Sequence, residues 1–355
     1  MLDRTVSDRV VSVQSVRPTA PSMNSDELAA AAHEVDGNAA RALQVLTSLP
    51  STARPGGGRT DEYFEILAKL GSADLTTARI AEAHLDAMAI VHQAGCTPVA
   101  PGESWGVFAA EMPGMTLTAT RSGARWRLDG TKPWCSIAGL LSNALVTARA
   151  ERPDGAWGRR LFAVDLRQAG VEVHDEVWVA RGLAQVTSGP VDFSAVVADA
   201  VGDDGWYLRR PGFAWGGIGV AAVWWGGAVG MARTLYESSQ GRTPDQIALA
   251  HLGAVDVTVT ASKMALAAAA TAIDAGEADG AAGSVLAARV RGIVARTVDE
   301  VIFHVGHALG PAPLALDARH VQRVADLQLY VRQHHAERDD AALGRMLAMR
   351  GSAPW

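Results

Sequence analysis

The residues best equipped for chemistry in this sequence follow one another at Trp134, Cys135 and Ser136. Side chains alternate in type over residues 126–128, and Asp129-Gly130 is a two-residue turn signal. Together these features predict a β-hairpin whose second strand carries an aromatic ring and a hydroxyl group side by side. Taken alone, the segment fits an ordinary surface hairpin with a half-buried tryptophan at least as well.

Histidines supply the next candidates, above all the pair His334 and His335 near the end of the chain. Histidine titrates near neutral pH, so either ring could position or transfer a proton. The pair also fits a plain helix end, where a cation is favourable. His84 and His92 are eight residues apart without a third ligand at metal spacing, so we predict a helix surface there and no metal site.

Composition limits the kind of partner. Of the 355 residues, 48% are hydrophobic and 20% are charged, and the formal net charge is −6 with a pI of 5.9. A nucleic-acid surface needs a basic stripe, so no nucleic-acid partner is expected. Two cysteines are too few for a disulfide framework, and the first twenty residues hold no apolar signal segment. We therefore expect a cytoplasmic protein.

One window, Phe213 to Ala232, has no charged side chain and reaches the length of a membrane span. It contains six glycines, and no other window in the sequence reads this way. A buried helix of a bundle is also apolar on all its faces. We therefore predict a buried helix and no membrane partner.

The pattern divides the chain into three predicted domains, at residues 1–97, 98–205 and 206–355. The first is helical, with a cap signal at Ser25 and a second helix opening at Asp74, and its first ~24 residues are expected to be flexible. The second has period-two alternation and frequent turns, which is typical of strands. The third returns to helical patterns rich in alanine, a residue with high helix propensity.

A resemblance to a known family assigns a function to Trp134 and Ser136. Residues 130–137, GTKPWCSI, resemble the G-x-K-x-W-I-T-N pattern in the middle β-domain of the acyl-CoA dehydrogenase family. The resemblance runs in order from about Glu62 to about Arg345. It implies an α+β fold with N-terminal helices, a middle β-barrel-like domain and a C-terminal four-helix bundle, together with bound FAD.

The same resemblance implies the cofactor site. Trp134 would stack beside the flavin, Ser136 would hydrogen-bond its N5 edge, and Cys135 lies between them. Glu111 matches the glutamate of a T-E-P-x-x-G-S-D pattern that lines flavin and substrate, although the threonine and the G-S-D turn are missing here.

A further family pattern, Q-x-x-G-G, contacts the FAD of a neighbouring subunit, and residues 307–310 resemble it with His307 in the glutamine position. Gly310 would complete the match, or it simply caps a helix. The resemblance implies a homodimer or a homotetramer.

The catalytic carboxylate of the dehydrogenases has no counterpart here. The corresponding stretch runs from Arg323 to His335, and the glutamate position holds Arg332, Gln333, His334 or His335, depending on the register. Arginine followed eleven residues later by histidine resembles the branch of the family that includes flavin-dependent monooxygenases.

Three function classes remain open. The first is a flavoprotein oxidoreductase acting on a small or medium organic substrate, for example an acyl-CoA thioester, through another base. The second is a monooxygenase-like enzyme that needs a reductase or another electron-transfer partner. The third is a non-catalytic paralogue that serves as a binding or structural subunit.

Overall fold

The computed structural model describes residues 23–50, 54–96, 100, 102–241 and 243–353. Helices fill the first part of the described chain, strands the middle and helices the last part, as predicted, in a mixed α and β fold. Residues 1–22, which include most of the segment expected to be flexible, fall outside the described residues. Whether the three parts are separate domains stays a prediction.

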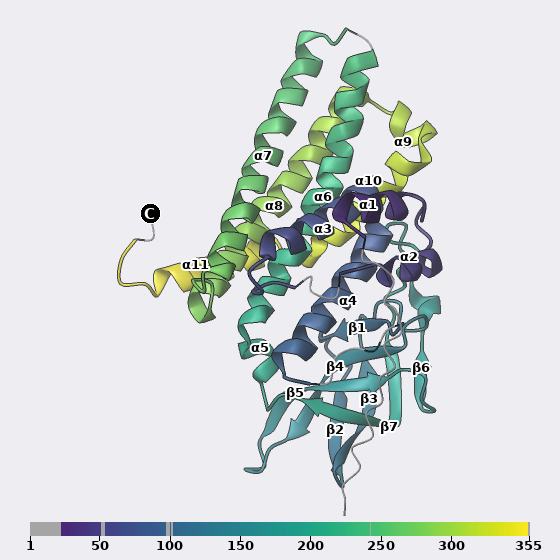
Figure 1. Ribbon diagram of the computed structural model, residues 1–355, viewed down its shortest axis with the longest axis vertical. Helices are drawn as coiled ribbons and strands as arrows, with labels where there is room; N and C mark the ends of the chain where they lie inside the picture. The colour runs from purple at the N-terminus through teal and green to yellow at the C-terminus, as the bar shows by residue number, and fades with distance from the viewer. Residues whose placement is uncertain (1–22, 51–53, 97–99, 101, 242, 354–355) are drawn as a thin grey trace, which may run out of the picture.

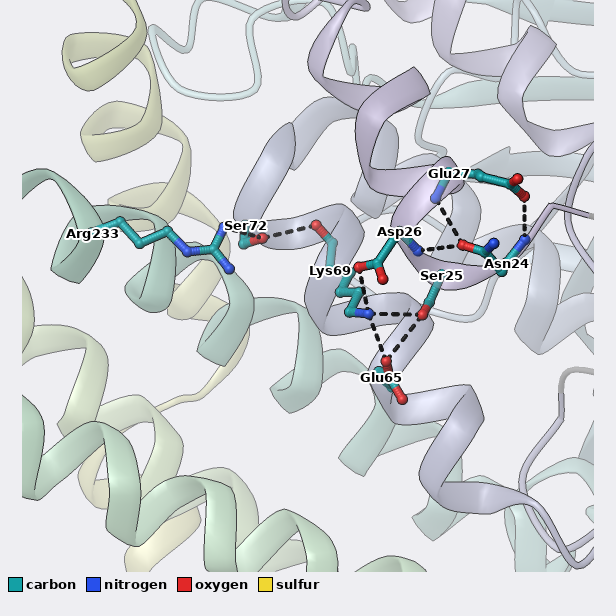
Figure 2. Close-up of polar contacts among 8 residues, drawn as sticks. All are labelled: Asn24, Ser25, Asp26, Glu27, Glu65, Lys69, Ser72 and Arg233. Atoms are coloured by element: carbon teal, nitrogen blue, oxygen red, sulfur yellow. Dashed lines mark hydrogen bonds and ion pairs between the residues drawn. The ribbon is translucent and has the colours of Figure 1, made fainter.

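Among the described residues, four helices precede the strands: α1 (Ser25–His33), α2 (Ala39–Leu46), α3 (Thr60–Ala73) and α4 (Leu75–Gln93). The α1 cap is Asn24, one residue before the predicted position, and it forms a capping box with Glu27 (Figure 2). Asp74 caps α4 as predicted, because its carboxylate accepts from the Thr77 N–H. Lys69 on α3 ties α1 to α3 through Asp26 (Figure 2).

In the part of the chain that the structure describes, seven strands form one sheet that closes on itself: β1 (Trp105–Phe108), β2 (Leu117–Ser122), β3 (Arg125–Lys132), β4 (Asn143–Glu151), β5 (Trp157–Asp165), β6 (Val171–Val173) and β7 (Val191–Val201). The order is β1-β4-β2-β3-β7-β5, and β5 pairs back to β4. Closure removes the free edges of the five-strand circuit, so the predicted barrel-like unit is confirmed. The strands gather at one end of the long axis of the molecule (Figure 1).

The predicted hairpin turn at Asp129-Gly130 is wrong. Strand β3 runs through both residues, and its turn to β2 lies at Gly123 instead, where φ is 64°. Asp129 accepts from the Ala195 N–H, and Gly130 sits at a bulge with φ of 114°. The aspartate-glycine pair therefore serves a bulge, which has the same need for an unusual backbone conformation as a turn.

The last part of the described chain contains α5 (Trp206–Arg209), α6 (Pro211–Gly241), α7 (Gln246–Asp274), α8 (Gly280–Leu309), α9 (Ala312–Leu316), α10 (Ala318–Tyr330) and α11 (Glu337–Ala348), with short 3-10 turns at Asp175–Val177 and Val331–Gln333. Helices α6, α7 and α8 pack together and extend away from the sheet, and α10 packs on α6 (Figure 1). Helices α3 and α6 approach so closely that a Cβ at Gly226 would collide with the Ala68 carbonyl.

Two helices among the described residues, α6 and α7, are long and apolar enough to span a membrane by length and composition alone. In the most apolar window of α6, 67% of the residues are buried inside the protein, so the predicted buried helix is confirmed. The corresponding value for α7 is only 22%. Helix α7 therefore presents an apolar surface that the sequence reading did not single out; it includes Ile247, Leu249, Val257 and Met264.

Candidate functional site

Trp134 lies in the loop that follows β3, where the sequence predicted a strand. Its φ of 59° is unusual for a bulky residue, and its side chain is 52% exposed. The ring meets Trp178 edge to face, with ring centroids 6.5 Å apart. Trp134 therefore offers an accessible aromatic face that a second tryptophan supports from the side.

Ser136, two residues further on, turns toward helix α4. Arg79 donates to its hydroxyl oxygen across 3.1 Å, and Ser188 lies 2.9 Å away. Because the Ser188 hydroxyl donates to the Val186 carbonyl, the Ser136 hydroxyl must donate to Ser188. Hydrogen-bond donation thus runs in one direction, from Arg79 through Ser136 to Ser188.

Arg79 belongs to a buried polar relay, which we define as Ser136, Arg79, Glu82 and Tyr330. Arg79 and the Tyr330 hydroxyl both donate to Oε2 of Glu82, at 2.9 and 3.0 Å. The side chains of Arg79 and Glu82 are only 15% and 10% exposed. The relay therefore joins the loop after β3 to α4 and to the end of α10.

Burial controls the electrostatics of this relay. It raises the pKa of Glu82 above that of a free carboxyl, and Arg79 partly opposes the shift. Burial also raises the pKa of Tyr330 well above its usual value. Arg291 on α8 lies 4.7 Å above the ring of the buried Trp224, which meets Tyr330 edge to face. Arg291 thus places a second positive charge near the Tyr330 end of the relay.

A narrow cavity of about 10 Å³, room for roughly one water molecule, lies at the Ser136 end of the relay. Arg79 and Ser136 supply polar groups to its wall. The other lining side chains are mostly apolar and include Ile80, Trp105, Phe108 and Val186. The arginine therefore faces a small and largely apolar space.

A second buried ion pair lies one helical turn further along α4. Arg210 donates to Asp86 at 3.3 Å and to Gln93 at 2.9 Å, and its side chain is 2% exposed. Its guanidinium also stacks over the Tyr207 ring. This pair fastens the start of α6 to α4, and none of its residues lines the cavity beside Ser136.

The remaining residues predicted for the cofactor site do not converge with Trp134 and Ser136. Cys135 is fully buried, its N–H donates to the Gly189 carbonyl, and burial raises the pKa of its thiol. Glu111 is exposed and pairs with Arg159 on β5.

His307 and Gly310 lie at the end of α8 that leads to α9, away from the sheet (Figure 1). The His307 ring stacks on Phe303 with a centroid distance of 4.0 Å, and Gly310 caps α8 with φ of 65°. Within one chain these two residues are remote from the loop after β3. The helix-cap interpretation of Gly310 is confirmed, while a cofactor contact would require a second copy of the chain.

His334 and His335 follow the turn Val331–Gln333 and do not lie in a helix. His334 is buried, and burial lowers its pKa, with Asp339 opposing the shift. His335 is exposed beside Asp339. Of the two histidines only His334 is buried, and Arg291 donates to the carbonyl of Gln333, the residue before it.

The prediction of a helix surface for His84 is wrong, whereas His92 is exposed as predicted. His84 is buried, its Nδ1 accepts from the Trp105 N–H, and burial lowers its pKa to about 4. It is a neutral histidine that holds α4 against β1. Among the described residues, no three histidine, cysteine or carboxylate side chains meet at metal-binding distances.

The sequence reading missed Arg79, Glu82 and Asp86, which recur at intervals of three and four residues along helix α4. That spacing puts them on one face of α4, so the signal was present. Nothing in the sequence pointed to their partner, because Tyr330 is 248 residues from Glu82.

No family model matches this chain, and no curated protein matches it by sequence. Solved structures do match. Dibenzothiophene monooxygenase TdsC of Paenibacillus sp. A11-2, in complex with FMN and indole, superposes with a TM-score of 0.74 at 18% identity, over 93% of this chain and 98% of that one. Methanesulfinate monooxygenase MsuC of Pseudomonas fluorescens gives 0.74 at 18% identity, over 93% and 96%.

Butyryl-CoA dehydrogenase of Megasphaera elsdenii matches with a TM-score of 0.75 at 15% identity, over 91% of this chain and 98% of that one. A dehydrogenase and two monooxygenases thus share one architecture with this chain over nearly its whole length. The chain therefore has the acyl-CoA dehydrogenase fold, and its structural neighbours include the monooxygenase branch that the sequence resembled.

Proposed function

We propose that this chain is a flavin-dependent oxidoreductase that acts on a small organic substrate, with the flavin against Trp134 and Ser136. The observation that carries the proposal is the pairing of an exposed aromatic face with a hydroxyl whose orientation is fixed by a buried arginine. The fold supports it, since the TdsC complex holds FMN. A bound flavin would supply hydride acceptance and, once reduced, reaction with oxygen.

The residues present fit one face of a flavin ring. The exposed side of Trp134 can stack on a flat ring, and Trp178 supports its edge. Ser136 already accepts from Arg79, so its own proton is free to leave Ser188 for a ring acceptor. The cavity beside Ser136 is too small for the ring, which would therefore lie on the outer side of the loop.

The sequence resemblance implies FAD, and binding measurements with FAD and with FMN identify which flavin the chain holds. FAD would need contacts for its second nucleotide half, and His307 and Gly310 could supply these only from a second copy. We propose a homodimer or homotetramer built on the apolar side chains of α7 that remain exposed in one chain. Sedimentation of wild type and of Met264→Lys tests this, with dissociation expected for the variant.

A monooxygenase-like reaction is the form that we favour. Arg332, one candidate for the base position, pairs with Asp299 and is exposed, and His334 is the only buried side chain among the four candidates. Efficient α-proton abstraction from a thioester needs a positioned base, worth roughly 10²–10⁴-fold in rate. A monooxygenase needs no such base, but it needs a reductase partner, which we also propose.

The experiment uses the purified chain loaded with FMN or FAD. Under anaerobic conditions, butyryl-CoA should not bleach the flavin absorbance, whereas chemically reduced flavin should be reoxidised when oxygen is admitted. Rapid bleaching by butyryl-CoA that His334→Ala abolishes would restore a dehydrogenase with an unusual base. If the chain binds neither flavin, the non-catalytic paralogue is the function class that remains. The cytoplasmic location stays a prediction from composition.

A further inference from the structure

We propose that the cavity beside Ser136 receives one oxygen of a small organic anion, such as a carboxylate, and that Arg79 is the residue that recognises it. This inference rests on the proposed flavin-dependent function, because Ser136 would serve both the flavin and the substrate. It names the substrate class of that site.

Arg79 has donors to spare. A guanidinium carries five N–H groups. Among the described residues, Nη1 donates to Glu82 and Nη2 donates to Ser136, which leaves three N–H groups without a protein acceptor. The side chain is 15% exposed and forms part of the cavity wall. Its remaining donors can therefore meet a ligand without breaking the ion pair.

The acceptor on the cavity side is a neutral hydroxyl. An anionic oxygen forms a shorter and roughly twice as strong hydrogen bond with a guanidinium. It would therefore bind the unused N–H groups of Arg79 more strongly than a neutral acceptor such as Ser136 binds its one. Ser136 would keep its contact with Arg79, because Nη2 carries a second N–H.

The surroundings favour a negative ligand of small size. Apolar side chains such as Ile80 and Phe108 line most of the cavity, and a low local dielectric strengthens charge-assisted contacts. The space holds about one oxygen atom, so only the head of a substrate enters, and its body must lie outside the cavity.

Arg79 is also held in place before any ligand arrives. Glu82 binds it from α4, Tyr330 holds Glu82 from α10, and the Arg79 guanidinium lies 5.7 Å from the centre of the Tyr330 ring. Arg291 is a further cation near Glu82 and Tyr330, and Asp86 is already paired with Arg210. A positioned cation needs little reorganisation on binding, which favours affinity.

The test measures binding of sodium acetate by calorimetry, with uncharged acetamide as the isosteric probe. The full chain is used with whichever flavin it binds. Acetate should bind wild type and acetamide should not. Arg79→Gln should weaken acetate binding about 10- to 100-fold, since it removes a charged hydrogen bond. Arg79→Lys should fall between, and Arg149→Gln, an exposed arginine on β4, should match wild type.

Equal acetate affinity in wild type and Arg79→Gln, equal affinity for acetate and acetamide, or no saturable acetate binding by wild type would each overturn the inference. If Arg79→Gln does not fold, Arg79→Lys and the comparison of acetate with acetamide decide it. A flavin titration separates the two proposals. Arg79-dependent acetate binding without any flavin binding would refute only the proposed function, whereas flavin binding without acetate binding would refute only this inference.

Discussion

Two buried ion pairs lie one turn apart on helix α4, and they differ in what their arginines reach. Arg79, paired with Glu82, extends to Ser136 and the cavity wall, whereas Arg210, paired with Asp86, contacts only residues of the surrounding scaffold. Burial raises the pKa of both carboxyl groups, and the paired arginines oppose the shift. The electrostatic environment is therefore similar, and the arrangement of free donors differs.

Burial alone therefore does not mark a functional charge. Both pairs pay a desolvation penalty, and both become costly when one partner is removed. Stability measurements should therefore treat the pairs alike. Ligand measurements should separate them, because only Arg79 presents unused donors to a cavity.

The largest expected effect comes from removing one carboxylate. Glu82→Ala and Asp86→Ala should each lower the free energy of unfolding by about 3–5 kcal/mol, because each leaves an arginine buried without its partner. Urea unfolding followed by circular dichroism measures this. Replacing a whole pair, as in Arg79→Met with Glu82→Leu, should cost much less. A loss below about 1 kcal/mol for either single variant would contradict the desolvation of the ion pair that it breaks.

Lys132 contrasts with the two arginines, since it is a buried cation with no carboxylate partner. Its ammonium group donates only to Thr147 among the described residues, and burial lowers its pKa to about 8. Between pH 8 and the usual lysine pKa of about 10.5, the unfolded chain binds the proton and the folded chain does not. Stability should therefore rise by about 3 kcal/mol over this range.

The measurement is the free energy of unfolding at several pH values, with Lys132→Met as the matched variant. The variant should lose the rise above pH 8. A rise of the same size in Lys132→Met would assign it to other groups. Arg79 and Arg210 should contribute nothing over the same range, because arginine keeps its charge there.

Disturbing the contact between α3 and α6 should have a smaller effect on the free energy of unfolding. This contact supports the relay, because Trp224 on α6 packs on Tyr330. Gly226→Ala would push a methyl group into the Ala68 carbonyl and should cost about 1–3 kcal/mol. Gly253→Ala on α7, where a Cβ meets open space, is the control and should stabilise by up to about 1 kcal/mol. Thermal unfolding compares the two, and equal shifts would contradict close packing at Gly226.

The smallest effects belong to the exposed network of Figure 2, which contrasts with the buried pairs. Lys69 contacts Asp26 and Glu65 at the surface, so Lys69→Ala should cost at most about 1 kcal/mol and the loss should fade at high salt. Asn24→Ala removes a helix cap and should cost about 1 kcal/mol at any salt concentration. A salt-independent loss for Lys69→Ala would contradict its surface role.

Much of the fold was predictable from the sequence because helix caps and periodicity are local signals. Asp74 and the apolar window of α6 are examples. Local signals failed where one residue type serves two conformations, as at Asp129-Gly130, where a bulge replaces a turn. They also failed for His84, because burial of a helix face depends on distant strands such as β1.

The candidate site was predictable only in part. Trp134 and Ser136 belong to a contiguous motif, so the resemblance could single them out. The relay joins α4 to α10 across most of the chain, and its Arg79 and Glu82 have no local signature beyond their spacing. Their roles depend on tertiary contacts that no local pattern encodes.

The central claim, a flavin held at Trp134 and Ser136, is tested most directly by titrating the purified chain with FMN and FAD and following flavin fluorescence. We expect saturable binding of at least one flavin. Trp134→Ala should weaken it about 2- to 10-fold through lost stacking, and Trp157→Ala, an exposed tryptophan on β5, should leave it unchanged. Binding that is absent in wild type, or weakened equally by both substitutions, would contradict a flavin site at Trp134 and Ser136.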